Sequence, residues 1–200
     1  MSLTLAIKPT IVDRVIKNSL ASDIALVVAG TIFTAIAAQL YIPASPVPFT
    51  FQTLAVLLVG ASLGSLRGAL SMGLYAVVGG LGLPVFTEAS SGMSVLFGAT
   101  GGYIIGFIIA AALVGYLSEK NFSSNVLKMA VSYTAGTIVI YALGATWLTY
   151  GYLGGVWTGD QGGLAYGVLP FLIWDAVKAV VAAGLLPASW KLVNLIKGRK

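Results

Sequence analysis

The chain has 200 residues, of which 58% are hydrophobic and only 8% are charged. Soluble globular domains carry about 25% charged residues, so this composition excludes such a domain and predicts an integral membrane protein. The sequence contains neither cysteine nor histidine, which excludes disulfides, thiol chemistry, haem ligation and the zinc sites built on these residues. We therefore expect no metal and no cofactor. The chain has a net charge of +5, and its basic residues lie at the expected helix ends. This placement indicates membrane topology and not nucleic-acid binding.

Residues 1–21 are predicted to form a segment in the cytoplasm or at the membrane surface. Charged residues interrupt this segment repeatedly, so it lacks the continuous apolar region of a cleavable signal peptide. Thr10 and Asp13 have the spacing of a capping box, in which two side chains satisfy backbone amides at the start of a helix. This spacing predicts a short amphipathic helix at the membrane surface.

Residues 22–190 are predicted to form one domain, a compact all-α bundle of six transmembrane helices with both chain ends in the cytoplasm. The charge-free runs are long enough for crossings that need about 20 residues each. Three prolines divide the first run, because proline lacks the backbone donor that a helix requires. The predicted helices cover residues 22–41, 50–66, 68–84, 101–118, 127–150 and 164–187. Residues 191–200 are predicted to form a basic cytoplasmic tail.

The basic residues set the predicted orientation. With the N-terminus in the cytoplasm, every lysine and arginine except Lys178 lies at a cytoplasmic helix end, as the positive-inside rule requires. The extracellular loops 41–49, 84–100 and 151–163 contain no basic residue. The middle loop is too long for a tight connection, and loops of this length are often lids or binding loops. We therefore expect a ligand cavity on the extracellular side.

Two opposite charges lie inside the sixth predicted helix. Asp175 and Lys178 are three positions apart and share a helix face with Phe171 and Trp174. A charge near the middle of a span costs about 2.5 to 3.5 kcal/mol unless it is paired or hydrated. The pair must therefore face protein or water.

Three interpretations of this pair are open from the residues alone. It is a neutralised clamp between helices with nothing bound, a part of a proton relay, or a ligand site. The relay is disfavoured because we expect no further acid and no histidine at membrane depth. The ligand site is favoured, since a carboxylate accepts hydrogen bonds, an ammonium donates them and aromatic rings supply apolar walls.

Residues 60–64 match the G-x-S-x-G pattern of serine hydrolases. Ser62 lacks the usual histidine base, so an intramembrane serine hydrolase is a weak alternative. Gly60, Gly64 and Gly68 instead form a ladder of small residues that lets helices approach closely. No nucleotide-binding G-x-x-x-x-G-K-[ST] sequence occurs. The chain is therefore not expected to be an enzyme, and any ATP hydrolysis must come from partner subunits.

A second ladder of small residues lies on the first predicted helix, at Ala21, Ala25 and Ala29. Such ladders are frequent where helices pack within a membrane bundle. The alternative is a docking face for another membrane protein. The pattern itself leaves both interpretations open.

Several longer motifs occur together along the chain. They are residues 47–60 and 63–68, Tyr75 with residues 79–86, residues 101–103 and the Asp175-x-x-Lys178 pair. In combination these motifs resemble the BioY family, the biotin-specific S components of energy-coupling factor transporters. The resemblance implies a subunit of the prokaryotic cytoplasmic membrane that captures biotin from outside and delivers it inward. An S component for another small vitamin is the alternative.

The resemblance also implies partners. In this family the S component associates with a transmembrane coupling component, called the T component, and with two ABC-type ATPases. An alanine ladder on the first helix contacts the coupling component. Here that ladder maps onto Ala25 and Ala29, extended to Ala21. The lipid bilayer and biotin complete the expected partners, and no nucleic acid is implied.

The binding pair of the family maps onto Asp175 and Lys178. We expect Asp175 to accept hydrogen bonds from the ureido N–H groups of biotin, and Lys178 to donate to a polar oxygen of the vitamin. Trp174 or Phe171 is expected to lie against the bicyclic rings. Weaker candidates, each equally compatible with helix capping or simple exposure, are Thr50, Gln52, Glu88, Ser91 and Tyr103.

One position departs from the family pattern. Residues 98–103 contain Ala99 where the G-P-T-G-G-Y motif of the family has proline. Alanine frees one backbone dihedral and restores an amide donor, so we expect the lid loop to be less rigid at this point.

Overall fold

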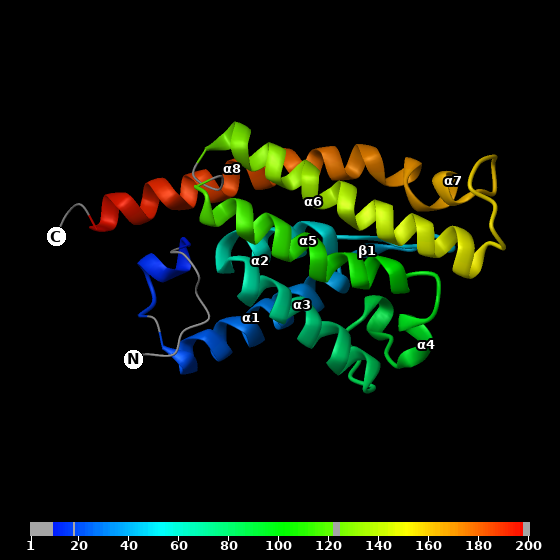
Figure 1. Cartoon of the computed structure of the whole chain (residues 1–200), viewed down its shortest axis with the longest axis horizontal. Coiled ribbons are helices and arrows are strands. Elements are labelled where there is room, and N and C mark those ends of the chain that lie inside the picture. Colours follow the sequence, from blue (N-terminus) through cyan, green and yellow to red (C-terminus); the bar gives the residue numbers. More distant parts are fainter. Residues whose placement is uncertain (1–9, 18, 122–124, 198–200) are drawn as a thin grey trace.

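The structure is a computed structural model that describes residues 10–17, 19–121 and 125–197. The helices run mostly along its long axis, and α4 and α7 lie toward the end opposite the N-terminal segment (Figure 1). The longer helices are α1 (Leu20–Ala38), α2 (Gln52–Leu63), α3 (Ser65–Gly80), α5 (Gly101–Glu119), α6 (Val126–Trp147) and α8 (Leu172–Lys197). The short elements are η1 (Val12–Arg14), β1 (Tyr41–Ile42), β2 (Phe49–Thr50), η2 (Thr87–Ala89), α4 (Met93–Leu96), η4 (Leu148–Tyr152), α7 (Gly163–Gly167) and η5 (Leu169–Phe171).

The helical fold class is confirmed, and the first five predicted helices match observed helices to within a few residues. The sixth begins at Leu172 instead of residue 164, because the chain leaves the helical conformation at Val168 (φ −133°) and Pro170 has no backbone N–H with which to continue the helix from α7. The short helices α7 and η5 occupy the intervening residues. Helix α8 then continues through Pro187, so residues of the predicted tail extend the helix as far as Lys197.

Polar side chains cap the starts of α1 and α6. The Ser19 hydroxyl accepts the backbone N–H of Ser22 at 3.2 Å, and the Ser22 hydroxyl accepts the backbone N–H of Ser19 at 2.9 Å. At the start of α6, the Asn125 side-chain oxygen accepts the backbone N–H groups of Leu127 and Lys128 at 3.0 and 3.2 Å. These contacts satisfy amides that have no partner within the helix, and so fix where α1 and α6 begin.

The turn between α2 and α3 requires glycine. Gly64 has a φ of +89°, a conformation that L side chains rarely adopt. The Glu119 carboxylate accepts the backbone N–H of the next residue, Ser65, at 2.8 Å. A Cβ on Gly64 would lie 2.8 Å from that same carboxylate oxygen. The turn therefore brings the ends of α2 and α3 tightly against α5.

The glycine ladder packs helices, as predicted. A Cβ on Gly60 would lie 2.5 Å from the carbonyl oxygen of Ala111 in α5, and one on Gly68 would lie 2.9 Å from the Cα of Gly60. Ser62 lies within helix α2 and not at the sharp strand-to-helix turn that a nucleophile elbow needs. The observed geometry of this motif is that of close helix packing.

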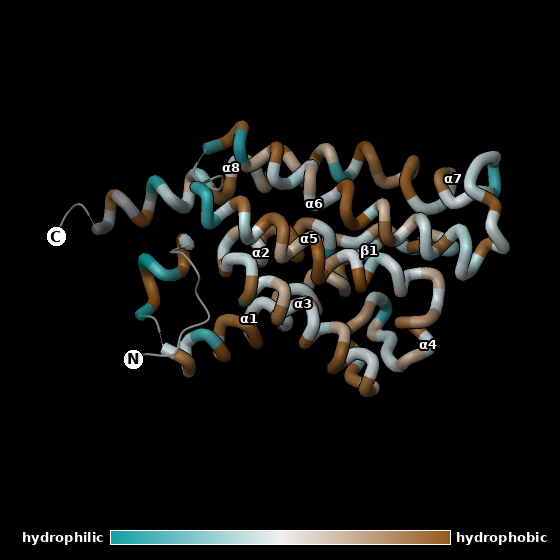
Figure 2. Tube along the Cα trace, viewed as in Figure 1, coloured by the Kyte–Doolittle hydropathy of each residue, from teal (hydrophilic) through white to brown (hydrophobic). Residues whose placement is uncertain are grey.

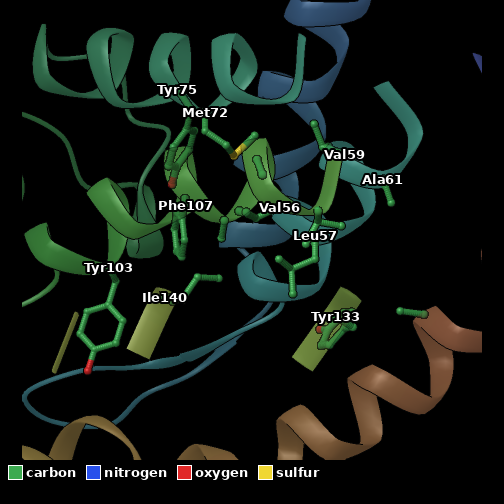
Figure 3. Close-up of a cluster of buried hydrophobic side chains, with 14 of the residues drawn as sticks. Val56, Leu57, Val59, Ala61, Met72, Tyr75, Tyr103, Phe107, Tyr133 and Ile140 are labelled. Carbon is green, nitrogen blue, oxygen red and sulfur yellow. The ribbon is translucent and has the colours of Figure 1, made fainter. Parts of the chain in front are cut away.

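The core lies where α2, α3 and α5 meet. Figure 3 shows Val56, Leu57, Met72, Tyr75 and Phe107 clustered between these helices. Each of these side chains is at most 4% exposed. Helix α5 packs against α2, α3 and α6 and is therefore the central helix of the bundle.

The outer faces of the helices are apolar. Among the described residues, four helical stretches are long and apolar enough to cross a membrane, namely Leu20–Ala38, Gly101–Glu119, Val126–Tyr152 and Gly163–Lys191. Large apolar side chains such as Ile32 and Val180 are 53% and 75% exposed on these helices. Hydrophilic segments concentrate at the two ends of the bundle (Figure 2). This distribution suits a hydrocarbon solvent, and the chain is a multi-pass membrane protein.

The N-terminal segment is anchored to the bundle. Asp13 accepts hydrogen bonds from both the backbone N–H and the hydroxyl of Thr10, at 2.7 and 2.9 Å. The described part of the segment forms the single 3₁₀ turn η1 in place of the expected amphipathic helix. The reason is Arg67, 1% exposed, whose guanidinium contacts Asp13 at 2.5 Å and Asp23 at 3.5 Å. A buried cation needs such partners, and Asp13 supplies one of them from the N-terminal segment.

Candidate functional site

A cavity of about 290 Å³ lies between the loops that follow α1 and α3 and the helices α2, α5, α6 and α8. Its apolar wall includes Val47, Pro48, Phe86, Ile104, Phe107 and Phe171. Its polar lining includes Thr50, Gln52, Thr53, Thr87, Glu88, Ser90, Tyr103, Tyr141, Asp175 and Lys178. An apolar wall with a few convergent polar groups is typical of a small-molecule site.

The charged pair of α8 lies in this cavity. The Lys178 Nζ atom is 2.7 Å from Asp175 Oδ1, and the two residues are 8% and 6% exposed. Lys178 also donates to the backbone carbonyl of Thr50 at 2.7 Å and to the Thr53 hydroxyl at 3.0 Å. The three N–H groups of the ammonium therefore have three acceptors, one of them on β2.

The Asp175 carboxylate has two further donors. The Thr53 hydroxyl donates to Oδ1 at 3.3 Å, and the Tyr141 hydroxyl of α6 donates to Oδ2 at 2.5 Å. Together with Lys178, these groups stabilise the ionised carboxylate in a site largely shielded from solvent. The pair thus connects three helices, α2, α6 and α8.

Thr53 and Tyr141 were not predicted from the sequence, although α6 carries a pattern that indicates Tyr141. Tyr133, Thr137 and Tyr141 are spaced four apart in an otherwise apolar helix, so their hydroxyls share one face. Such a polar stripe indicates the side that faces protein instead of lipid. Thr53 gives no comparable signal, because a single threonine on an apolar helix is common in membrane bundles.

Of the two aromatic candidates on α8 and its approach, only Phe171 lines the cavity. Its ring centroid is 4.6 Å from that of Phe49 and 6.5 Å from that of Tyr141. Trp174 is 51% exposed and is not among the lining residues. A helix turns by about 100° per residue, so Asp175 and Lys178 centre the inward face and Trp174 lies at its edge.

Gln52 lines the cavity but its amide is already engaged. Its side-chain oxygen accepts the hydroxyls of Thr50 and Thr87 at 3.0 and 3.1 Å, and its nitrogen donates to the Tyr75 hydroxyl at 2.7 Å. Thr50 belongs to the loop after α1, and Thr87 to the loop after α3. Gln52 therefore ties the two cavity loops to each other and to α3.

The loop after α3 presents Glu88 to the cavity. Glu88 and Ala89 have φ values of 62° and 51°, in the left-handed region that costs a non-glycine residue about 1–2 kcal/mol. Gln39, at the end of α1, holds this conformation: its nitrogen donates to the Phe86 carbonyl at 2.9 Å, and its oxygen accepts the Ala89 N–H at 3.0 Å. The predicted Ser91 does not line the cavity, but the neighbouring Ser90 does.

The start of α5 completes the wall. Tyr103 lines the cavity and donates its hydroxyl to the Gly167 carbonyl at 2.8 Å. The preceding loop, which contains Ala99, is held from α6: the Trp147 indole N–H donates to the Gly98 carbonyl at 2.9 Å. This bond restrains the loop at the residue before Ala99.

The alanine ladder of α1 contributes no residue to the cavity lining. Ala21, Ala25 and Ala29 are all exposed, so in the described part of the chain they do not pack inside the bundle. The opposite face of α1 carries the buried Gly30 and Thr34. The ladder is therefore an outward-facing surface of small side chains.

Comparison with protein families matches residues 8–195 to the BioY family. The biotin transporter BioY of Thermotoga maritima is 40% identical over 161 residues, which are 79% of this chain and 90% of that protein. The probable biotin transporter BioY of Pyrococcus horikoshii is 36% identical over 163 residues, which are 81% of this chain and 92% of that protein.

A solved structure shares the fold. The crystal structure of the S-component for biotin from an ECF-type ABC transporter superposes with a TM-score of 0.73 at 25% sequence identity, and the match covers 86% of this chain and 92% of that chain. The match to the family thus runs over nearly the whole chain, in sequence and in fold. The resemblance expected from the motifs is confirmed, and the chain belongs to the BioY family.

Proposed function

We propose that the chain is the biotin-binding S component of an energy-coupling factor importer, which captures biotin with high affinity on the extracellular side of the cytoplasmic membrane. The observation that carries the proposal is the buried Asp175–Lys178 pair, which lies in a cavity of about 290 Å³ with aromatic and apolar walls. The membership of the chain in the BioY family names the ligand.

The polar groups of the cavity are complementary to a cyclic urea. The ureido ring of biotin presents two N–H donors beside a carbonyl acceptor, and an Asp175 carboxylate next to a Lys178 ammonium offers both an acceptor and a donor. Lys178 donates to a ligand oxygen by exchanging one of its present acceptors. Phe171 and Phe107 supply the apolar surface against the rings.

The other lining residues have different roles in the proposed site. Glu88 and Thr50 contact ligand, whereas Gln52 and Tyr103 hold the walls through the bonds that they already make. Trp174 and Ser91 have no part in it, because neither lines the cavity.

We propose six membrane crossings, formed by α1, α2, α3, α5, α6 and α8, within a domain of residues 22–190. In Figure 1 the N-terminal segment, the end of α5, the start of α6 and the end of α8 lie at one end of the bundle. In the sequence, Lys120 follows α5, Lys128 lies in the first turn of α6 and Lys191 lies in the last third of α8. The positive-inside rule makes this end cytoplasmic. The cavity loops then lie at the extracellular end.

Delivery of biotin requires partners in this proposal. A T component docks on the exposed ladder of Ala21, Ala25 and Ala29, where small side chains permit close helix approach. Two ABC-type ATPases supply the energy, since the chain has no Walker-type nucleotide motif of its own.

The test is biotin binding to the purified protein in detergent. Wild type should bind tightly, and Asp175→Asn and Lys178→Ala should each lose binding while their ligand-free helical content is retained. Asp160→Asn and Lys191→Ala change the same residue types outside the cavity and should bind as wild type does. If folded wild type binds no biotin but binds another vitamin, the ligand assignment is wrong. Ser62→Ala should bind biotin normally, since it alters a helix-packing serine.

A further inference from the structure

The Asp175 carboxylate is nearly saturated with donors from the protein. Oδ1 accepts from Lys178 Nζ at 2.7 Å and from the Thr53 hydroxyl at 3.3 Å. Oδ2 accepts from the Tyr141 hydroxyl at 2.5 Å. An ionised carboxylate has about four acceptor positions, two on each oxygen. Among the hydrogen bonds of the described residues, one acceptor position therefore remains, and it lies on Oδ2 beside Tyr141.

The Tyr141 hydroxyl has a fixed polarity in this arrangement. A phenol has a single proton, and Tyr141 gives it to Asp175, because a carboxylate can only accept. The phenol oxygen can then act only as an acceptor toward the cavity that it lines. Two acceptors, Oδ2 of Asp175 and the oxygen of Tyr141, are thus next to each other.

We infer that Tyr141 is a specificity-determining residue of the ligand site, one that orients Asp175 and reserves Oδ2 for an N–H donor of the ligand. The inference rests on the proposed function. It adds that the group recognised is an N–H donor of the ligand and that Asp175 and Tyr141 recognise it. A ligand carbonyl oxygen beside Oδ2 of Asp175 and the Tyr141 oxygen would face two acceptors, and none of the three atoms would have a proton to donate to another. A ligand that lacks the N–H would leave a buried acceptor unpaired, which is the strongest form of discrimination open to a polar site.

Lys178 has a different part in this arrangement. Its three N–H groups have acceptors on Asp175, Thr53 and Thr50. The bond to Asp175 secures Oδ1 and remains when a ligand oxygen replaces Thr53 or Thr50, so Oδ2 is left to the ligand. Tyr141 secures Oδ2 from α6. The carboxylate is therefore held by donors on three helices, Thr53 on α2, Tyr141 on α6 and Lys178 on α8, which restricts the orientation that it presents to the ligand.

The experiment measures dissociation constants for biotin and for its two derivatives that carry a methyl group on one or the other ureido nitrogen. The full chain in detergent is used. Wild type should bind at least one derivative about a hundredfold more weakly than biotin. Tyr141→Phe should bind biotin about ten- to a hundredfold more weakly, since it loses a hydrogen bond to a charged group. It should also discriminate against that derivative about tenfold less than wild type does.

Thr53→Val is the matched variant, because it removes the other hydroxyl donor of the same carboxylate, on Oδ1. It should weaken binding of biotin and of the derivative alike, so that their ratio stays at the wild-type value. Tyr116→Phe, which alters a tyrosine that is 51% exposed on α5, should change neither constant. Ligand-free thermal unfolding checks that each variant is folded.

Two results would overturn the inference. One is a Tyr141→Phe protein that discriminates between biotin and the derivatives as strongly as wild type. The other is a wild type that binds both derivatives as tightly as biotin, a result that needs no variant to fold. A wild type that binds no biotin at all would instead overturn the proposed function.

Discussion

The Lys178 ammonium on α8 donates a 2.7 Å hydrogen bond to the backbone carbonyl of Thr50, the last residue of β2. The same ammonium lies 2.7 Å from Asp175. One side chain therefore neutralises the buried carboxylate and also attaches the loop after α1 to α8. Ligand recognition and loop position depend on a common group, so a change at Lys178 affects both.

Lys178→Met should destabilise the ligand-free protein by about 3–5 kcal/mol, because it leaves Asp175 as an unpaired buried charge. Asp175→Asn/Lys178→Met removes both charges and should recover much of this loss. Thermal unfolding in detergent without biotin measures the difference. Equal stabilities of the single and double variants would show that Lys178 does not neutralise the Asp175 carboxylate.

Arg67→Met should also lower the free energy of unfolding, by about 3–5 kcal/mol. The guanidinium is 1% exposed and lies between Asp13 and Asp23, so its removal leaves two buried carboxylates close together. Proteolysis within residues 10–17 should become faster, because Arg67 anchors this segment. Lys17→Met removes an exposed cation of the same segment and should leave stability unchanged. A stable, protease-resistant Arg67→Met protein would contradict this account.

The helices and the charged pair were predictable because both depend on local sequence. Long charge-free runs can satisfy their backbone groups in a bilayer only as helices, and a spacing of three places Asp175 and Lys178 on one helix face. The family motifs then identified the ligand class. These signals do not require knowledge of how the helices are rotated against one another.

The partners of the pair depend on that rotation and were therefore missed. Tyr141 reaches Asp175 only because α6 turns its hydroxyl stripe toward α8. Trp174 lies on the same general face of α8 as Asp175, but at the outward edge of that face. Trp174 is therefore 51% exposed. In the loop after α3, left-handed residues at Glu88 and Ala89 turn the chain so that Ser90 and not Ser91 lines the cavity. No local pattern indicates such a turn at non-glycine residues.

Gln39→Leu should release the loop that carries Glu88. The Gln39 amide makes two hydrogen bonds to that loop, of 2.9 and 3.0 Å, and they offset the cost of two left-handed residues. Without them the loop should open more often, and biotin should dissociate about fivefold faster or more, as expected for the loss of two neutral hydrogen bonds. A dissociation time course with labelled biotin measures the rate.

Gln161→Leu is the control for this change, since Gln161 is an exposed glutamine of another loop. Its dissociation rate should equal that of wild type. If Gln39→Leu released biotin no faster than Gln161→Leu, the Gln39 amide would not restrain the cavity loop.

Ala25→Trp should block assembly with the T component and leave biotin binding unchanged. Ala25 is exposed on α1 and is not among the residues that line the cavity, so a bulky ring there fills only the space into which a partner helix would fit. Val180→Trp places the same ring on α8, at a residue that is 75% exposed, and should assemble normally because that face meets lipid. Copurification with the T component and the ATPases, together with the biotin dissociation constant of each variant, separates docking from ligand capture. Normal copurification of Ala25→Trp would assign the alanine ladder to lipid contact and would place the docking surface elsewhere on the bundle.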